Sequence, residues 1–236
     1  MTANEWSFET KQIHAGYELD PATGATALPI YQTSSYAFED TAQAANRFAL
    51  QELGPIYTRL TNPTTDAVAS RIAALEGGVG GLLVSSGQSA TALAILALAV
   101  AGNNIVASPA LYGGTVTLLK NTLGRLGIET RFVSDPLDID AWRALADDKT
   151  VAFFGETIPN PQGNILDIEP IAALAHDVGV PLIVDNTVAT PYLIRPIEWG
   201  ADIVVHSATK YLGGHGTSIA GVIIDAGNFD FASQPE

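Results

Sequence analysis

Cysteine is absent from this chain of 236 residues, and basic residues are scarce. The lack of cysteine excludes disulfides, thiolate nucleophiles and cysteine-ligated metals, and it fits a reducing compartment. Eleven lysines and arginines stand against 25 aspartates and glutamates, which gives a formal net charge of -14 at pH 7. We therefore expect no nucleic acid and no anionic membrane as partner, and we interpret the charge as an aid to solubility.

Long hydrophobic runs are lacking as well. The longest apolar stretch, residues 90–101, is shorter than the ~20 residues that a membrane-spanning helix needs. Residues 1–10 are polar and acidic, unlike a signal or transit peptide. These features predict a cytoplasmic protein. Because 47% of its residues are hydrophobic, the chain can still bury a substantial core.

The apolar pattern changes at about residue 64. Residues 1–63 are predicted to form an irregular N-terminal extension with one helix at about 41–53. In residues 64–236, apolar strands alternate with amphipathic helices. The strands are expected near residues 81–85, 104–108, 128–133, 150–154, 181–185, 202–206 and 219–224, and the helices near 64–76, 88–101, 113–126, 138–147 and 168–179.

This alternation predicts an α/β fold built on a mostly parallel sheet of seven strands. In such sheets, ligands bind beyond the carboxyl ends of the strands. The residues that follow each predicted strand are therefore the candidates for a functional site. After the last strand, no closing element is expected, and the chain is predicted to end short of a complete fold.

Lysine is rare, with four residues in all, and Lys210 has unusual surroundings. It follows the apolar strand of residues 202–206 after a short turn of small residues, and glycines come next. A lysine held near the carboxyl end of a buried strand can lose its proton and become an amine nucleophile. Lys210 is therefore predicted to form a Schiff base with an aldehyde cofactor.

Residues at the other strand ends suit a flat, phosphorylated ligand. The small residues 85–90 open a helix whose N-terminus favours an anion, although an ordinary helix cap explains them equally well. Tyr112 can lie against a ring and Asn160 can bond a ring hydroxyl, but packing or a turn better explains each one alone. Asp185 ends an apolar strand, where its carboxylate needs a partner such as a protonated ring nitrogen.

Ser207 and Thr209 add hydroxyls beside Lys210, so that a phosphate and an aldehyde can be bound together. His206 and His215 are interpreted as structural, and no metal site is expected, because no carboxylate or third histidine stands at ligand spacing. Each feature is weak alone. Together, at successive strand ends of one sheet, they predict a site for pyridoxal 5'-phosphate (PLP).

The motifs resemble those of the Cys/Met-metabolism family of fold-type I PLP-dependent enzymes, over essentially the whole chain. The resemblance is carried by Tyr57-Thr-Arg59, Asn62-Pro63, Ser85-Ser-Gly87-Gln88, Tyr112-Gly-Gly-Thr115, Asn160-Pro161, Asp185-Asn-Thr187 and Ser207-Ala-Thr-Lys210.

The resemblance implies a role for each motif. Lys210 would be the Schiff-base lysine, Asp185 the partner of the pyridinium nitrogen and Tyr112 the residue that stacks on the ring, and these three are the expected catalytic residues. Asn160 would bond the 3-hydroxyl group. The residues expected to hold the phosphate are Gly87, Gln88, Ser207 and Thr209.

Tyr57 and Arg59 imply an oligomer. In this family a Tyr-x-Arg pair reaches the phosphate of a neighbouring subunit, and a planar guanidinium suits bidentate phosphate binding. The resemblance thus implies a homodimer within a homotetramer, with active sites shared between subunits. Residues 1–63 would be the intersubunit arm and residues 64–236 the PLP-binding large domain, and the family's C-terminal domain is expected to be missing.

Gln88 and residues 213–217 resemble a subgroup that acts on O-acetylhomoserine. The implied reaction is γ-replacement by sulfide or a thiol, which gives homocysteine or methionine and releases acetate. Cystathionine synthesis and γ-elimination by a cystathionine or methionine lyase stay open, because cofactor motifs do not report the nucleophile. A non-catalytic protein that binds the cofactor is a more remote alternative.

Overall fold

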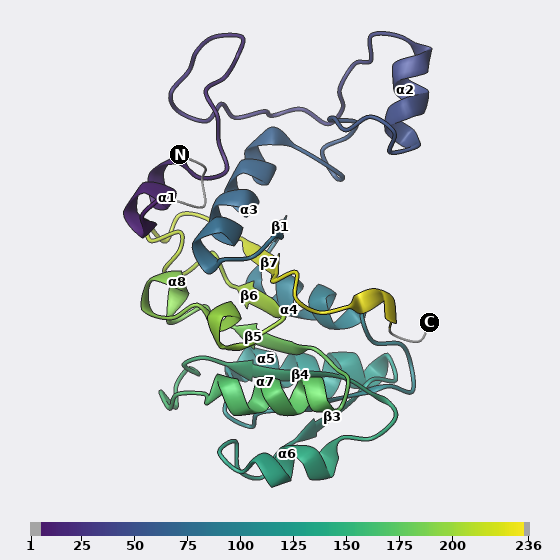
Figure 1. The fold of residues 1–236 in the computed structure, drawn as a ribbon, viewed down its shortest axis with the longest axis vertical. Helices are drawn as coiled ribbons and strands as arrows, with labels where there is room; N and C mark the ends of the chain where they lie inside the picture. Colours follow the sequence, from purple (N-terminus) through teal and green to yellow (C-terminus); the bar gives the residue numbers. More distant parts are fainter. Residues whose placement is uncertain (1–5, 234–236) are drawn as a thin grey trace. The chain divides into compact units, whose positions relative to one another are not determined.

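The computed structural model describes residues 6–233. The chain divides into two compact units, Met1–Ile72 and Ala73–Glu236. Figure 1 shows helices α1 (Phe8–His14), α2 (Thr41–Phe48) and α3 (Pro63–Glu76) in the purple and blue part of the chain. The unit boundary falls within α3, so the last turn of this helix belongs to the second unit.

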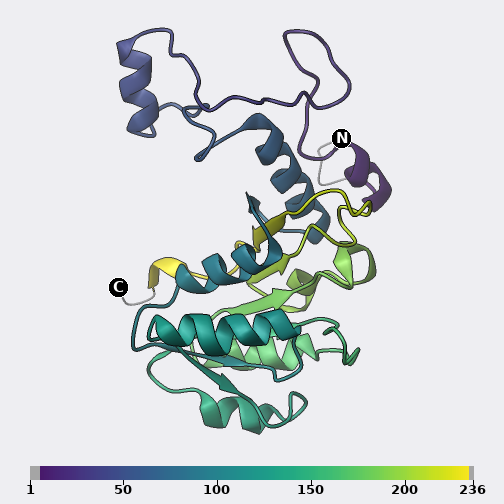
Figure 2. The same cartoon turned by 180° about the vertical axis from the view of Figure 1, so that it is seen from behind.

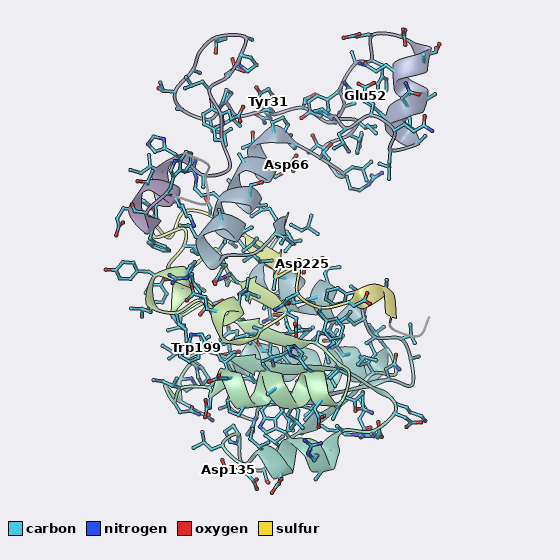
Figure 3. The ribbon with its side chains drawn as sticks, viewed as in Figure 1. Tyr31, Glu52, Asp66, Asp135, Trp199 and Asp225 are labelled. Atoms are coloured by element: carbon cyan, nitrogen blue, oxygen red, sulfur yellow. The ribbon has the colours of Figure 1, made fainter. Side chains whose placement is uncertain are left out.

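Long loops of the first unit are anchored to the start of α3. The Asn62 side-chain amide donates to the Tyr31 carbonyl at 2.9 Å, and the Thr64 hydroxyl donates to the Pro29 carbonyl at 3.0 Å. Tyr31, whose carbonyl is part of this anchor, and Asp66, in the first turn of α3, are labelled in Figure 3. Backbone groups in a loop need such partners, and here polar side chains provide them.

Two expectations for this region were wrong. Helix α1 stands in a segment predicted to be irregular; the Ser7 hydroxyl accepts the N–H of Thr10 at 3.3 Å, a helix cap that the sequence reading overlooked. Helix α2 ends at Phe48 rather than at residue 53. Leu50 adopts a positive φ of 57°, which no helix can continue through.

The second unit contains the predicted seven-stranded sheet. Its strands are β1 (Gly80–Val84), β2 (Asn104–Ala107), β3 (Glu129–Phe132), β4 (Thr150–Glu156), β5 (Leu182–Asp185), β6 (Ile203–His206) and β7 (Gly221–Asp225). Their spatial order is β1-β7-β6-β5-β4-β2-β3. Strand β7 pairs antiparallel with both neighbours and all other pairings are parallel, so the remaining strands run in one direction.

Helices cover both faces of the sheet. Helix α7 (Ile168–Asp177) lies over one face in Figure 1, and α4 (Gly87–Leu96) and α5 (Gly113–Thr117) lie over the other in Figure 2. A π-helix, Leu118–Leu123, continues α5, where the sequence predicted one unbroken α-helix. Helix α6 (Ile139–Leu145) follows Asp135, which is labelled in Figure 3. Short turns complete the unit: α8 (Thr190–Leu193) and the 3₁₀ segments Pro196–Trp199 and Phe231–Ser233.

The core lies between these layers. Ile105, Phe154 and Ile183, from three neighbouring strands, are fully buried. Trp142 of α6 packs on Phe153 of β4 with ring centroids 5.5 Å apart. The seven observed strands begin and end within two residues of the predicted ones, and the predicted α/β class with a mostly parallel sheet is confirmed. Among residues 6–233, no helix is both long and apolar enough to span a membrane.

Candidate active site

The carboxyl ends of β1, β2, β4, β5 and β6 surround one pocket of about 1040 Å³. The structure brings together all eight predicted site residues of the second unit, and each of them lines this pocket: Gly87, Gln88, Tyr112, Asn160, Asp185, Ser207, Thr209 and Lys210. The pocket forms at this edge because parallel strands present all their carboxyl ends on one side.

The start of α4 forms one wall of the pocket. The Ser86 hydroxyl caps the helix by accepting the N–H of Ser89 at 3.1 Å. Helix geometry leaves the N–H groups of Gly87 and Gln88 without an intrahelical partner, so both can bind an anion. The cap and the anion site, which the sequence left as alternatives, are therefore compatible with each other.

Gly87 allows this wall to approach the loop after β6. A Cβ atom placed on Gly87 would lie 2.5 Å from the Cβ of Ser207, closer than two carbon atoms can stand. The bare backbone of Gly87 thus faces the Ser207 side chain, and hydroxyl and amide donors from two elements meet in one cradle. Such a cradle fits a phosphate group.

Lys210 lies in the turn after β6. Its N–H donates to the Ser207 carbonyl at 3.1 Å, and its own carbonyl accepts the N–H of Gly214 at 2.9 Å, so the backbone is held on both sides. Lys210 follows the buried strand β6 closely, as predicted, and its own side chain is exposed and lines the pocket. The amine is therefore open to a ligand that enters the pocket.

Asp185 ends β5 and is held by its neighbours. Its Oδ1 accepts the N–H of Thr187 at 2.9 Å and also the Thr187 hydroxyl, which in turn accepts the N–H of Ser207 at 2.7 Å. Burial of the carboxyl group raises the pKa of Asp185, while the bonds from Thr187 and the charge of His206 act in the opposite direction. Thr187 thus links the predicted ring-nitrogen partner to the predicted phosphate loop.

Glu156 is a site residue that the sequence reading missed. It ends β4, pairs in register with Asp185 and lines the same pocket. Burial, together with the nearby charge of Asp185, raises the pKa of Glu156 to about 8. The signal was available, because Glu156 follows an apolar strand just as Asp185 does.

The Glu156 carboxyl group joins two loops of the pocket. It accepts the backbone N–H of Tyr112 at 2.8 Å and is also hydrogen-bonded to the backbone of Asn160 and the side chain of Thr115. Glu156 therefore positions both residues that were predicted to contact a cofactor ring. The Tyr112 ring stands beside Gly114, where an added Cβ would lie 2.5 Å from Cε1 of the tyrosine.

Thr209 lines the pocket, but its hydroxyl is already engaged. It donates to the Ala220 carbonyl at 3.1 Å and accepts the N–H of the same residue at 3.1 Å. Donation of this proton to a phosphate would require the hydroxyl to turn away from Ala220. The Gln88 side-chain amide, in comparison, makes only a long contact of 3.4 Å to the Thr115 hydroxyl.

Tyr57 and Arg59 belong to the first unit and lie beside each other. The Arg59 guanidinium carbon stands 4.9 Å from the centre of the Tyr57 ring. All residues that line the pocket come from the second unit, so the structure does not bring these two into the pocket wall. No group of three or more potential metal-ligating side chains occurs in the part of the chain that the structure describes.

Comparison with known proteins identifies the family. Residues 9–236 match the family described as Cys/Met metabolism PLP-dependent enzymes. The chain belongs to this family. Membership confirms both the predicted resemblance and the predicted cofactor, pyridoxal phosphate.

Curated members of the family include close relatives. The O-acetyl-L-homoserine sulfhydrylase of Corynebacterium glutamicum is 53% identical over 234 residues, which are 99% of this chain and 54% of the relative. The enzyme of the same name from Leptospira meyeri is 55% identical, with 95% of this chain and 51% of the relative covered. The homocysteine synthase of Schizosaccharomyces pombe is 54% identical, with 98% and 54% covered. The chain spans about half the length of these relatives.

Solved structures of the family share the fold. A crystal structure described as an O-acetylhomoserine (thiol)-lyase from Campylobacter jejuni superposes with a TM-score of 0.92 at 43% identity, covering 95% of this chain and 55% of that one. It contains N'-pyridoxyl-lysine-5'-monophosphate. The metB protein of Corynebacterium glutamicum superposes with a TM-score of 0.88 at 36% identity, covering 95% and 56%.

Proposed function

We propose that the protein catalyses PLP-dependent γ-replacement on O-acetylhomoserine, in which sulfide or a thiol replaces acetate to give homocysteine or methionine. The observation that carries the proposal is one pocket that gathers a lysine amine, a buried carboxylate and an anion cradle at adjacent strand ends. The choice of substrate is supported by the names of relatives that are 53% and 55% identical.

The pocket fits pyridoxal phosphate residue by residue. Gly87, Gln88 and Ser207 would hold the phosphate at the start of α4, with Thr209 beside them. Tyr112 would lie against the ring, Asn160 would bond its 3-hydroxyl, and Asp185 would face its nitrogen. When bound, the cofactor supplies an aldehyde that reacts with amines and a conjugated ring that accepts electrons from the substrate carbons.

Lys210 and Asp185 would each control a different proton. The Lys210 amine would bind the aldehyde and, once displaced by the substrate amine, take the proton from the substrate α-carbon. Asp185 would keep a proton on the ring nitrogen, since an ionised carboxylate close to that atom stabilises the cationic form. Loss of a second proton at Cβ would let acetate leave from Cγ. Sulfide or a thiol would then add at Cγ, and return of one proton each to Cβ and Cα would complete the product.

The oligomer belongs to the same proposal. Tyr57 and Arg59 would reach the phosphate bound by a second subunit, so that the enzyme acts as a homodimer or homotetramer with shared sites. Residues 1–63 would form the intersubunit arm and residues 64–236 the PLP-binding domain. We further propose that the enzyme works in the cytoplasm.

Product analysis tests the reaction. The protein is incubated with O-acetylhomoserine alone, with sulfide and with cysteine. Homocysteine that forms only with sulfide is the expected result. Cystathionine formed with cysteine, or 2-oxobutyrate formed without a thiol, would instead assign a sister activity of the same pocket, and bound cofactor without any product would contradict an enzymatic role.

A further inference from the structure

A second polar cluster lies at the same strand ends as the pocket but is closed off from solvent. It consists of Glu76 at the end of α3, Thr157 after β4, Asn186 after β5 and His206 at the end of β6. Glu76, Asn186 and His206 are 0% exposed and Thr157 is 2% exposed. None of the four lines the pocket.

Hydrogen bonds join the four side chains. Oε1 of Glu76 lies 2.6 Å from Nε2 of His206 and accepts the Asn186 side-chain amide at 2.8 Å. The Thr157 hydroxyl donates to Oδ1 of Asn186 at 3.0 Å. Glu76 is thus the hub that ties the end of β6 to the end of β5, and Thr157 extends the connection to β4.

Each strand-end member of the cluster is the sequence neighbour of a pocket residue. Asn186 follows Asp185, and His206 precedes Ser207. In each pair one residue belongs to the buried cluster and the other lines the pocket, because successive side chains of an extended chain point to opposite sides. The backbone adds further ties: the N–H of Asn186 donates to the Val205 carbonyl at 2.9 Å. A shift of either cluster residue therefore moves a pocket residue directly.

Stability alone gives no reason for this cluster. Among the described residues, Oε2 of Glu76 and Nδ1 of His206 are buried without a hydrogen-bond partner. Unpartnered buried polar atoms cost free energy, and apolar residues of similar volume often replace a buried ion pair without loss of stability. The cluster does affect the pocket, because the charge of His206 counteracts the rise that burial causes in the pKa of Asp185.

We propose that Glu76 and His206 are positioning residues, which hold the ends of β5 and β6 so that Asp185 and Ser207 stand at the separation that the cofactor requires. The proposal rests on the proposed function, since it concerns the same pyridoxal phosphate site. Neither residue lines the pocket, and both act through the backbone of their neighbours.

Two variants separate positioning from stability. His206→Leu leaves the buried Glu76 carboxyl group without its histidine partner, and the double variant Glu76→Leu with His206→Leu removes both members of the pair. Urea unfolding reports stability, and fluorescence titration of the cofactor-free protein with pyridoxal phosphate reports binding. We expect the double variant to recover the stability that the single variant loses, yet to bind pyridoxal phosphate about 10-fold more weakly than the wild type, or worse.

The chain offers a control in another histidine–carboxylate pair, in which an exposed histidine contacts a buried aspartate. Nε2 of His176 lies 2.9 Å from Oδ2 of the buried Asp202, which precedes β6 at the amino end of this strand, away from the pocket. His176→Leu should change stability and leave pyridoxal phosphate binding as in the wild type. A double leucine variant that binds the cofactor like the wild type would overturn the positioning role.

A conservative variant tests the same proposal if the double variant does not fold. Glu76→Gln keeps the shape of the hub and removes its charge, and we expect it to weaken pyridoxal phosphate binding by about 3-fold or more. Unchanged binding by this variant also overturns the proposal. If the wild-type protein itself binds no pyridoxal phosphate, the proposed function fails. If the variants bind it as tightly as the wild type does, only the positioning role fails.

Discussion

Two carboxylates at adjacent strand ends, Glu156 and Asp185, show how environment divides roles between similar residues. They pair in register, and burial raises the pKa of each. Glu156, with a pKa of about 8, holds its proton at neutral pH and keeps its bonds to the Tyr112 and Asn160 loops. Because a neutral Glu156 adds no second negative charge, Asp185 would be the one carboxylate of the pair to face the cationic nitrogen in the proposed mechanism.

Glu156 makes the stability of the cofactor-free protein depend on pH. Its pKa is about 8 in the folded protein and about 4.5 when unfolded, so between these values the folded state binds more protons. The free energy of unfolding should therefore fall as pH rises from 5 to 8. Glu156→Gln removes this contribution, so we expect its stability relative to the wild type to increase steadily over that range, by an amount that urea unfolding at each pH measures.

Glu169, an exposed residue in the first turn of α7, gives the matched control for this series. Glu169→Gln makes the same substitution outside the pocket, and the difference between the Glu156→Gln and Glu169→Gln curves is the quantity that tests Glu156. Parallel curves for Glu156→Gln and the wild type would mean that Glu156 does not carry the extra proton.

Lys210→Ala tests the covalent role of the only pocket lysine. Without the amine no bond to the cofactor aldehyde can form, and no base remains at the substrate α-carbon. We expect the visible absorbance of the protein–cofactor adduct to disappear and turnover to fall by about 10³-fold or more. Spectra and initial rates are compared with those of Lys120→Ala, which alters an exposed lysine on the π-helix. Retained absorbance and turnover in Lys210→Ala would refute the assignment.

Asp185→Ala separates cofactor binding from catalysis. Lys210 and the residues of the phosphate cradle remain, but Thr187 loses its bonds to Asp185, so pyridoxal phosphate should bind more weakly and still with measurable affinity. Turnover should be nearly lost, because no carboxylate then favours a proton on the ring nitrogen. Equal kcat values for this variant and the wild type would exclude the proposed role of Asp185.

At the scale of elements, the start of α4 and the loop after β6 approach each other closely in the pocket wall. Gly87→Ala places a methyl group within 2.5 Å of the Ser207 Cβ, so one of the two elements must move. We expect the free energy of unfolding to fall by about 1–3 kcal/mol, with weaker binding of pyridoxal phosphate. Thermal unfolding and a binding titration measure the two effects.

Gly124→Ala is the control for this joint, because an added Cβ there meets no atom within 4 Å and φ is -58°. Alanine at such a position should leave stability unchanged or slightly higher. Equal cofactor affinity for Gly87→Ala and Gly124→Ala would show that the close approach at Gly87 does not shape the site.

Some secondary-structure elements could be predicted from the sequence and others could not. The strands were predictable because buried parallel strands are continuous apolar runs, as in residues 182–184. Helix α1 was missed because none of its residues is buried, so its sequence has no apolar face to detect. The π-helix after α5 keeps the apolar spacing of an α-helix, with Leu119 and Leu123 buried, and spacing alone cannot distinguish the two.

At the scale of the whole molecule, the proposed sharing of sites between subunits has a direct test. Arg59→Ala would damage the neighbour's phosphate site, and Lys210→Ala would damage a subunit's own. If the two inactive variants are unfolded together and refolded as a mixture, half of the dimers are expected to be mixed, each with one intact site. Activity should then return to about a quarter of the wild-type value.

Refolding each inactive variant alone provides the control for this experiment. Neither should regain activity, and size measurement should show the same oligomer in all samples. A mixture that stays inactive, although it contains mixed dimers, would place Arg59 in the site of its own subunit or outside any site.

The sequence by itself determined the strands, the ligand-binding edge of the sheet and the lysine, because apolar runs and the residues after them are local features. It also identified the family, whose motifs are short and contiguous. Only the tertiary structure decided which side chains share an environment. Glu156 acquires its pKa of about 8, and Glu76 meets His206, only when elements that are separate in the sequence are packed together. Burial and electrostatic coupling depend on all neighbours at once, and no local pattern records them.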